Sequence, residues 1–175
     1  VGPGRVGELV HALTGEKVKA HPSLLLGSAD LSVYTMSQMY QFLASGGRVQ
    51  PLQSVRAVLD PQGKALSKYE NEPVTAQKGD AMAARLLAFG LQQTVTSGSA
   101  RALLSEGLGD LQSAGKTGTS NDSRDSWYAG YTGDHLAVIW VGNDKNEPTG
   151  LYGATGAMRV WAQLFKRLPS RPLRI

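Results

Sequence analysis

Apolar residues recur at the three- and four-residue spacing of a one-sided helix in four parts of the chain. The first covers residues 6–13 and ends at Gly15, and the second follows Ser32, a residue type that caps helix N-termini. The third covers residues 78–93, and the fourth closes the chain. Each helix should bury its apolar face. The residues expected to point inward are Met36, Met39, Tyr40 and Leu43 in the second helix, Met82, Leu86 and Phe89 in the third, and Met158, Trp161, Leu164, Phe165 and Leu168 in the fourth.

Short strand-like runs lie between these helices and are separated by turn signals. Two of them, within residues 55–69, flank Asp60-Pro61-Gln62-Gly63, which predicts a β-hairpin. From Gln112 onward the runs LQSAGKTGT, DSWYAGY and HLAVIWVGND follow one another, the last two separated by Thr132-Gly133-Asp134. This order predicts a three-stranded antiparallel meander covered by the last helix, and therefore an α+β fold.

The composition is that of one globular domain, with 175 residues of which 41% are hydrophobic and 18% charged. The chain has no cysteine, which rules out disulfides, thiolate catalysis and a cysteine zinc site. His11, His21 and His135 have neither metal-ligand spacing nor an acid partner, so neither a metal nor a cofactor is predicted. No apolar run approaches the roughly 20 residues of a membrane span.

A net charge of +4 and a pI of about 9.4 would suit an anionic partner. The basic residues are nevertheless scattered until the terminal run FKRLPSRPLRI. We interpret this run as a solvated end of the chain, because a short charged run is usually solvated surface. No nucleic-acid partner is predicted.

The stretch SAGKTGTSNDS, residues 113–123, can be interpreted in two ways. A phosphate-binding loop requires a glycine five positions before Gly115 and a helix after Thr117. Asp110 occupies the glycine position, and GTSNDS is rich in turn formers. The phosphate-loop interpretation therefore fails.

A substrate-binding strand fits the same residues better. In an extended strand, Lys116 and Gly118 lie on one side, and Thr117 and Thr119 lie on the other. A lysine ammonium and threonine hydroxyls are suited to binding a carboxylate, and Gly118 leaves room for a substrate alongside. Free backbone amides at a strand edge could also pair with a peptide.

The segments around this strand resemble the C-terminal part of a class A penicillin-binding protein, most closely the bifunctional 1b type. They are AGKTGTSNDSRDSWYAGY, AVIWVGND and LYGATGAM, with LLLGSADLSVYTMSQMYQFLASGGR and VTSGSARAL upstream. The likeness covers essentially the whole chain in the family's order. The family carries three motifs: Ser-x-x-Lys with the nucleophile, a second serine motif, and Lys-Thr-Gly.

Only the third motif is present here. The one Ser-x-x-Lys match, Ser113 to Lys116, overlaps the Lys-Thr-Gly strand and therefore cannot also begin the nucleophile helix. Tyr69-Glu70-Asn71 faintly resembles the middle motif, but it ends the second strand of the hairpin, and we interpret it as ordinary surface. By the resemblance, residues 1–175 are the C-terminal portion of a single transpeptidase domain, without the nucleophile region or a glycosyltransferase domain. The implied fold is the C-terminal half of the penicillin-binding-protein and β-lactamase-like fold, an antiparallel sheet covered by helices.

The resemblance implies a D,D-transpeptidase that cross-links peptidoglycan through a serine acyl-enzyme. Lys116 would hold positive charge next to that serine and the donor carboxylate. Thr117 and Thr119 would hydrogen-bond the carboxylate of a stem peptide or of a β-lactam, and Gly118 would lie beside it. The backbone N–H of Thr119 would supply half of the oxyanion hole, so Lys116 and Thr119 are the expected catalytic residues.

The same resemblance implies a companion part of the protein that carries the serine, so the chain alone is expected to be inactive. The upstream half of the same domain should pack against this chain, because a sheet edge left open invites pairing. The intact parent should be anchored in the bacterial inner membrane by an upstream helix, with this domain in the periplasm. The expected ligands are peptidoglycan stem peptides and β-lactam antibiotics.

Two alternatives remain open from the residues. One is a hydrolase that shares Lys-Thr-Gly, either a D,D-carboxypeptidase or a β-lactamase. The other is a non-catalytic module that docks partners of cell-wall synthesis. Trp127 and Tyr128 could line the cleft, although alternation directs only one of them to each face. Residues 121–123 could contact an acceptor substrate, although turn formation alone accounts for them.

Overall fold

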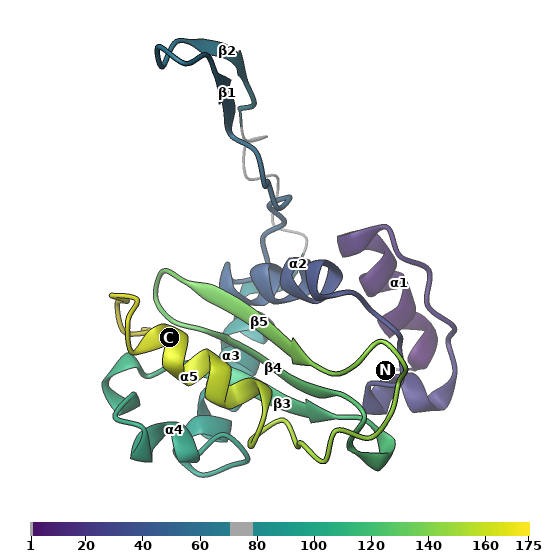
Figure 1. The fold of residues 1–175 in the computed structure, drawn as a ribbon. Helices are drawn as coiled ribbons and strands as arrows, with labels where there is room; N and C mark the ends of the chain where they lie inside the picture. The colour runs from purple at the N-terminus through teal and green to yellow at the C-terminus, as the bar shows by residue number, and fades with distance from the viewer. Residues whose placement is uncertain (1, 71–78) are drawn as a thin grey trace.

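A three-stranded antiparallel sheet forms the centre of the fold (Figure 1). Its strands are β3 (Ala114–Thr119), β4 (Ser126–Tyr131) and β5 (Leu136–Val141), in the order β3-β4-β5. The computed structural model describes residues 2–70 and 79–175. The sheet confirms the predicted meander, and its register pairs Lys116 with Ala129 and Thr117 with Tyr128.

One face of the sheet is covered by α5 (Ala157–Phe165), which packs on β4 and β5 (Figure 1). Trp161 is fully buried, stacks on Phe165 with ring centroids 3.8 Å apart, and meets Tyr128 edge-on at 5.4 Å. Its indole N–H donates to the carbonyl of Gly130 at 3.3 Å. The predicted covering helix is confirmed, except that Leu164 is exposed. The short helix α4 (Ala102–Ser105) completes this core with buried Leu103.

The other face carries α2 (Val33–Ala44) and α3 (Ala81–Thr96), and α1 (Pro3–Thr14) packs against α2. α2 begins at Ser32, whose hydroxyl accepts from the amide of Thr35 at 3.0 Å, as its cap chemistry predicts. α1 ends at Gly15, which has a φ of 77° and donates to the carbonyl of His11. Ala88, Leu91, Ala114 and Tyr131 form a second buried cluster, against which Tyr40 and Leu43 of α2 pack.

The predicted inward face of α3 is wrong. Met82 and Leu86 are each 64% exposed and Phe89 is 53% exposed. The stripe that faces the sheet consists instead of Ala84, Ala88, Leu91 and Val95. Both stripes have helical spacing, so periodicity alone could not choose between them. The small alanines allow α3 to lie close to β3, and the larger apolar residues remain on the outer side.

The predicted hairpin consists of β1 (Ala57–Leu59) and β2 (Ala65–Lys68), and it projects away from the sheet (Figure 1). Its turn is held by the Asp60 carboxylate, which accepts from the amides of Gln62 at 3.0 Å and Lys64 at 2.8 Å. Gly63 supplies the left-handed backbone, with a φ of 82°. Tyr69 and Glu70 follow β2, whereas Asn71 lies outside the described residues.

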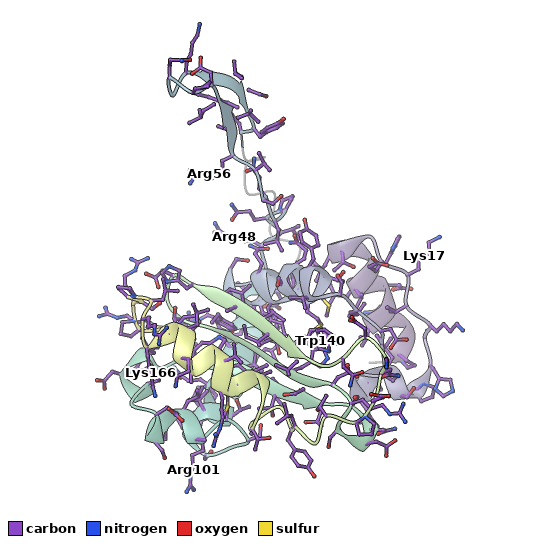
Figure 2. The ribbon with its side chains drawn as sticks, in the orientation of Figure 1. Lys17, Arg48, Arg56, Arg101, Trp140 and Lys166 are labelled. Carbon is purple, nitrogen blue, oxygen red and sulfur yellow. The ribbon has the colours of Figure 1, made fainter. Side chains whose placement is uncertain are left out.

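Basic side chains are distributed over separate parts of the molecule (Figure 2). Lys17 follows α1, Arg48 and Arg56 lie on the approach to the hairpin, and Lys166 ends α5. This dispersion agrees with the scattering of charge along the sequence. Within residues 2–70 and 79–175, no helix has both the length and the apolar character needed to cross a bilayer.

Candidate functional site

The Lys-Thr-Gly residues lie on β3, at one edge of the sheet. Away from β4, the carbonyl of Gly115 accepts from the Thr94 hydroxyl, and the carbonyl of Thr117 accepts from Lys116 Nζ at 3.0 Å. Backbone groups of alternate residues point the same way in an antiparallel strand. The N–H of Thr119 is therefore directed to the same open edge as the carbonyls of Gly115 and Thr117.

Lys116 and Gly118 lie on the face of the sheet that carries α3, and Lys116 is exposed. In the part of the chain that the structure describes, no carboxylate lies within ion-pair distance of Lys116. Its charge is therefore available to an anionic ligand. A Cβ at Gly118 would lie 3.2 Å from Cβ of Trp127, so the glycine also relieves crowding against β4.

Thr117 and Thr119 lie on the opposite face, and each hydroxyl meets one partner. Thr117 Oγ1 is 2.8 Å from Oγ of Ser99, and Thr119 Oγ1 accepts from the amide of Gly153 at 2.9 Å. A Cβ at Gly153 would lie 2.7 Å from the carbonyl oxygen of Gly118, so only glycine fits this closely against β3. The sequence did not predict either partner.

Trp127 and Tyr128, neighbours on β4, lie on opposite faces of the sheet, as the alternation predicts. Tyr128 is fully buried beneath α5, so it cannot line a cleft. Trp127 is half-buried on the other face, with its rings 6.4 Å from those of Trp140, whose indole N–H donates to Asp125 at 2.9 Å. Figure 2 shows Trp140 at the side of the sheet nearer α2. Of Trp127 and Tyr128, it is therefore Trp127 that shares a face with Lys116.

The loop between β3 and β4 is held by internal contacts. Asp122 and Ser123 have positive φ values of 59° and 53°, and Asp122 pairs with Arg124 at 3.3 Å. The carbonyl of Ser123 accepts from both the amide and the hydroxyl of Thr149, at 2.9 and 2.7 Å. These contacts fix the loop beside the end of β3.

Comparison with known proteins identifies the family. A family model described as "Penicillin binding protein transpeptidase domain" matches residues 14–166. The chain belongs to this family. Penicillin-binding protein 1B of Vibrio cholerae is 43% identical over 157 residues, which are 89% of this chain and 20% of that protein. Penicillin-binding protein 1B of Escherichia coli K12 is 38% identical over 154 residues, covering 88% of this chain and 18% of that protein.

Solved structures of penicillin-binding proteins share the fold. Penicillin-binding protein 1A of Haemophilus influenzae matches 99% of this chain and 32% of its own, with a TM-score of 0.79 and 21% identity. PonA1 of Mycobacterium tuberculosis matches 91% of this chain and 45% of its own, with a TM-score of 0.72 and 23% identity. The chain spans about a fifth of the length of the curated relatives named here. The expected family and fold class are confirmed.

The apparent Ser-x-x-Lys match of this transpeptidase chain is coincidental. Ser113 is fully buried just before β3, whereas Lys116 is exposed within the strand. The two residues therefore do not share the helical turn on which the family carries its nucleophile and lysine. The strand also excludes a phosphate loop, because a helix would have to begin at Thr117.

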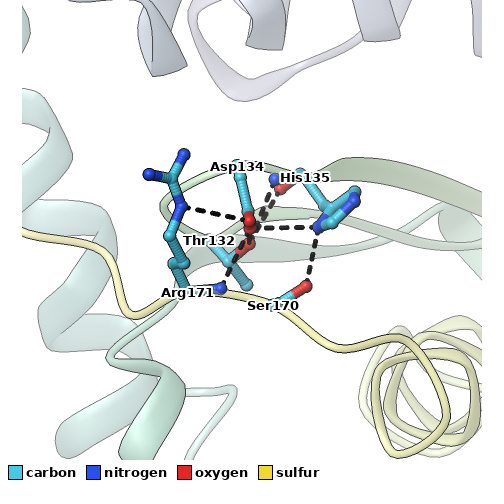
Figure 3. Close-up of polar contacts among 5 residues, drawn as sticks. All are labelled: Thr132, Asp134, His135, Ser170 and Arg171. Atoms are coloured by element: carbon cyan, nitrogen blue, oxygen red, sulfur yellow. Dashed lines mark hydrogen bonds and ion pairs between the residues drawn. The ribbon is translucent and has the colours of Figure 1, made fainter.

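A second polar cluster joins the β4–β5 turn to the C-terminal tail (Figure 3). His135 Nδ1 lies 3.0 Å from Asp134 Oδ1 and 2.8 Å from Ser170 Oγ, so the expectation that no histidine pairs with an acid is wrong for His135. A catalytic triad uses both ring nitrogens of its histidine, one toward the serine and one toward the acid. Here both contacts involve the same nitrogen, and the cluster does not have triad geometry.

The cluster instead attaches the C-terminal tail, at Ser170 and Arg171, to the turn between β4 and β5. Asp134 accepts from the amide of Arg171 at 3.0 Å and from its guanidinium at 3.3 Å, and Leu173 donates to the carbonyl of Leu111 at 2.9 Å. Burial raises the pKa of Asp134, but the hydrogen bonds from Arg171 and the charges of His135 and Arg171 outweigh it, so the net pKa lies below its usual range. The tail is therefore attached to the rest of the fold at Ser170, Arg171 and Leu173, while Arg171 stays exposed as expected of a solvated end. Among the described residues, no group of three acidic or histidine side chains could hold a metal ion.

Proposed function

We propose that β3 is the carboxylate-binding and oxyanion-binding strand of a serine D,D-transpeptidase that cross-links peptidoglycan. The observation that carries this proposal is the open edge of β3. There Lys116 is exposed without an ion-pair partner in the described residues, and the hydroxyls of Thr117 and Thr119 are held at fixed positions. Membership of the transpeptidase family supports the reaction class.

Each residue has a separate role in this proposal. Lys116 supplies positive charge to the donor carboxylate and to the nucleophilic serine, and the two threonine hydroxyls donate to the carboxylate. The N–H of Thr119 donates to the oxyanion that forms when the serine attacks the acyl carbonyl. Loss of one such donor typically lowers the rate about a hundredfold or more. A β-lactam would place its own carboxylate at the same hydroxyls.

The nucleophilic serine is proposed to lie in an upstream part of the same domain. The only Ser-x-x-Lys sequence in the chain begins at the buried Ser113, just before β3, and ends at Lys116 within that strand. The exposed outer stripe of α3, formed by Met82, Leu86 and Phe89, supports a packing partner on that side. In the proposal this partner carries the serine, and an upstream membrane anchor places the domain in the periplasm.

Labelling with a fluorescent penicillin tests the function. The full-length protein and the 175-residue chain alone are each incubated with the probe and separated under denaturing conditions. We expect stable label on the full-length protein and none on the chain alone. Stable label on the chain alone would contradict a serine located elsewhere.

A product assay separates the transpeptidase from the hydrolase alternative. The full-length protein is given a donor stem peptide ending in D-alanyl-D-alanine together with an amine acceptor. We expect the cross-linked product. Release of D-alanine with hydrolysis only would identify a carboxypeptidase, and turnover of the penicillin would identify a β-lactamase. Absence of both label and product from the full-length protein would favour the docking module.

A further inference from the structure

We propose that Ser99 is a positioning residue for the carboxylate site, which donates its hydroxyl proton to Thr117 Oγ1 and so directs the Thr117 proton outward to the ligand. The two hydroxyl oxygens are 2.8 Å apart, although 18 positions separate them in the sequence. The inference rests on the proposed function of β3. It adds a residue that none of the three family motifs contains.

The direction of this hydrogen bond follows from what a carboxylate requires. An ionised carboxylate only accepts hydrogen bonds, whereas a hydroxyl has one proton to donate and lone pairs with which to accept. If Thr117 donated to Ser99, it would have no proton left for the ligand. If Ser99 donates to Thr117, the Thr117 proton is free, and the donated bond also polarises it. A bound carboxylate therefore selects the second arrangement.

Thr119 on the same strand already has a hydroxyl oxygen that accepts a hydrogen bond and so keeps its own proton free. Its oxygen accepts from the backbone amide of Gly153 at 2.9 Å, and an amide N–H can only donate. The Thr119 proton is therefore free to donate elsewhere. The two threonines would present their protons in the same way, one set by a backbone amide and the other by the side chain of Ser99.

The backbone at Ser99 is fixed although its side chain is exposed. Val95, four positions earlier, is 3% exposed, and the adjacent Ala100 is fully buried, so the segment is anchored on both sides of Ser99. Thr94 binds the carbonyl of Gly115, so the end of α3 is fastened to β3. At Gly98 a Cβ would lie 2.8 Å from Cα of Thr94, which shows how tightly the chain turns there. The contact between Ser99 and Thr117 is therefore set by the fold.

The test measures the second-order rate of acylation of the full-length protein by benzylpenicillin and by its methyl ester. For Ser99→Ala we expect the rate with benzylpenicillin to fall roughly three- to tenfold, the usual worth of one hydrogen bond. The rate with the ester, which lacks the charge that Thr117 recognises, should be unchanged relative to wild type. Ser99→Thr should restore the rate with benzylpenicillin. The matched control is Ser97→Ala, because Ser97 is exposed and its hydroxyl donates to the carbonyl of Gln93 in α3.

A double-mutant cycle with Thr117→Ala identifies the route. If Ser99 acts through Thr117, then Ser99→Ala has no further effect once Thr117 is alanine. A further loss in that background would mean that Ser99 contacts the carboxylate itself, and it would overturn the positioning role. Equal slowing with benzylpenicillin and its ester, or a wild-type rate for Ser99→Ala, would also overturn it. Failure of the wild-type protein to acylate at all would instead contradict the proposed function.

Discussion

The helices on the two faces of the sheet differ in what they leave exposed. α5 buries the aromatic side chains of Trp161 and Phe165 and, of its apolar residues, leaves only the aliphatic Val160 and Leu164 partly exposed. α3 turns Ala84 and Ala88 inward and leaves Leu86 and the aromatic Phe89 outside. A helix that is apolar on two sides is usually buried on both. The inner side of α5 therefore supplies the large aromatic side chains of the core. The outer side of α3 is suited to contact with a further part of the protein.

The largest effect on stability should come from the core between α5 and the sheet. Trp161→Ala removes the centre of the core, where Trp161 contacts Tyr128 and Phe165. We expect the free energy of unfolding to fall by about 3–5 kcal/mol, as for other buried aromatic truncations. Urea denaturation of the full-length protein, followed by tryptophan fluorescence and circular dichroism, measures the change. A loss below about 1 kcal/mol would mean that α5 is not the main core helix.

A polar residue on the outer stripe of α3 should lower the stability of the full-length protein more than that of the 175-residue chain alone. Leu86→Ser should cost about 2 kcal/mol or more in the full-length protein, where we propose that this side is covered. In the 175-residue chain alone it should change stability by less than about 0.5 kcal/mol. The same denaturation measurements test both.

Val160→Ser is the matched control for Leu86→Ser. Val160 is 49% exposed on the outer side of α5, where we propose no partner, so its replacement should have little effect in either context. Equal and small effects of the two substitutions in the full-length protein would contradict a partner on α3.

A methyl group at Gly153 should disturb β3, because Gly153 packs closely against the backbone of that strand. Gly153→Ala places a Cβ 2.7 Å from the carbonyl oxygen of Gly118, so either the strand or the loop must move. We expect a stability cost of about 1–3 kcal/mol and slower penicillin acylation, because the Thr119 hydroxyl loses its fixed partner. Gly4→Ala is the control, since a Cβ there meets nothing within 4 Å. Unchanged acylation by Gly153→Ala would show that the Thr119 contact is dispensable.

The smallest effect should come from the tail. The Asp134 pKa is lowered in the folded state, so its ionised form stabilises the fold above the unfolded-state value of about 3.9. That contribution should be lost as the pH falls through the lower folded-state value. We therefore expect Asp134→Asn to be less stable than wild type at pH 6, with the gap closing below about pH 4. Thermal denaturation of both proteins between pH 2 and 7 measures it, and a gap that widens in acid would contradict the assignment.

The order and type of the main elements could be predicted because each depends on local signals. Ser32 caps α2, Gly15 ends α1, and Gly63 supplies the positive φ of the hairpin turn. The inward face of α3 could not be predicted, because two apolar stripes compete and only the neighbouring strand decides between them. The attachment of the tail could not be predicted, because its contact with Asp134 spans 37 positions.

The site was only half predictable for the same reason. The motif residues are consecutive in the sequence, so alternation along one strand correctly predicted which face of the sheet each side chain is on. They are Lys116, Thr117, Gly118 and Thr119. Ser99 and Gly153 reach the strand from 18 and 34 positions away, and nothing in either local sequence indicates which strand residue it meets. The contact of His135 with Asp134 is between neighbours, and adjacency alone could have revealed it.

The most direct test is to map the residue that penicillin acylates in the full-length protein. The labelled protein is digested, and the modified peptide is identified by mass spectrometry, with Lys116→Ala as a variant expected to lose most of the label. We expect one acylated serine, located outside these 175 residues. Acylation of a serine within them, such as Ser99 or Ser113, would contradict the assignment of β3 as a binding strand that serves a nucleophile elsewhere.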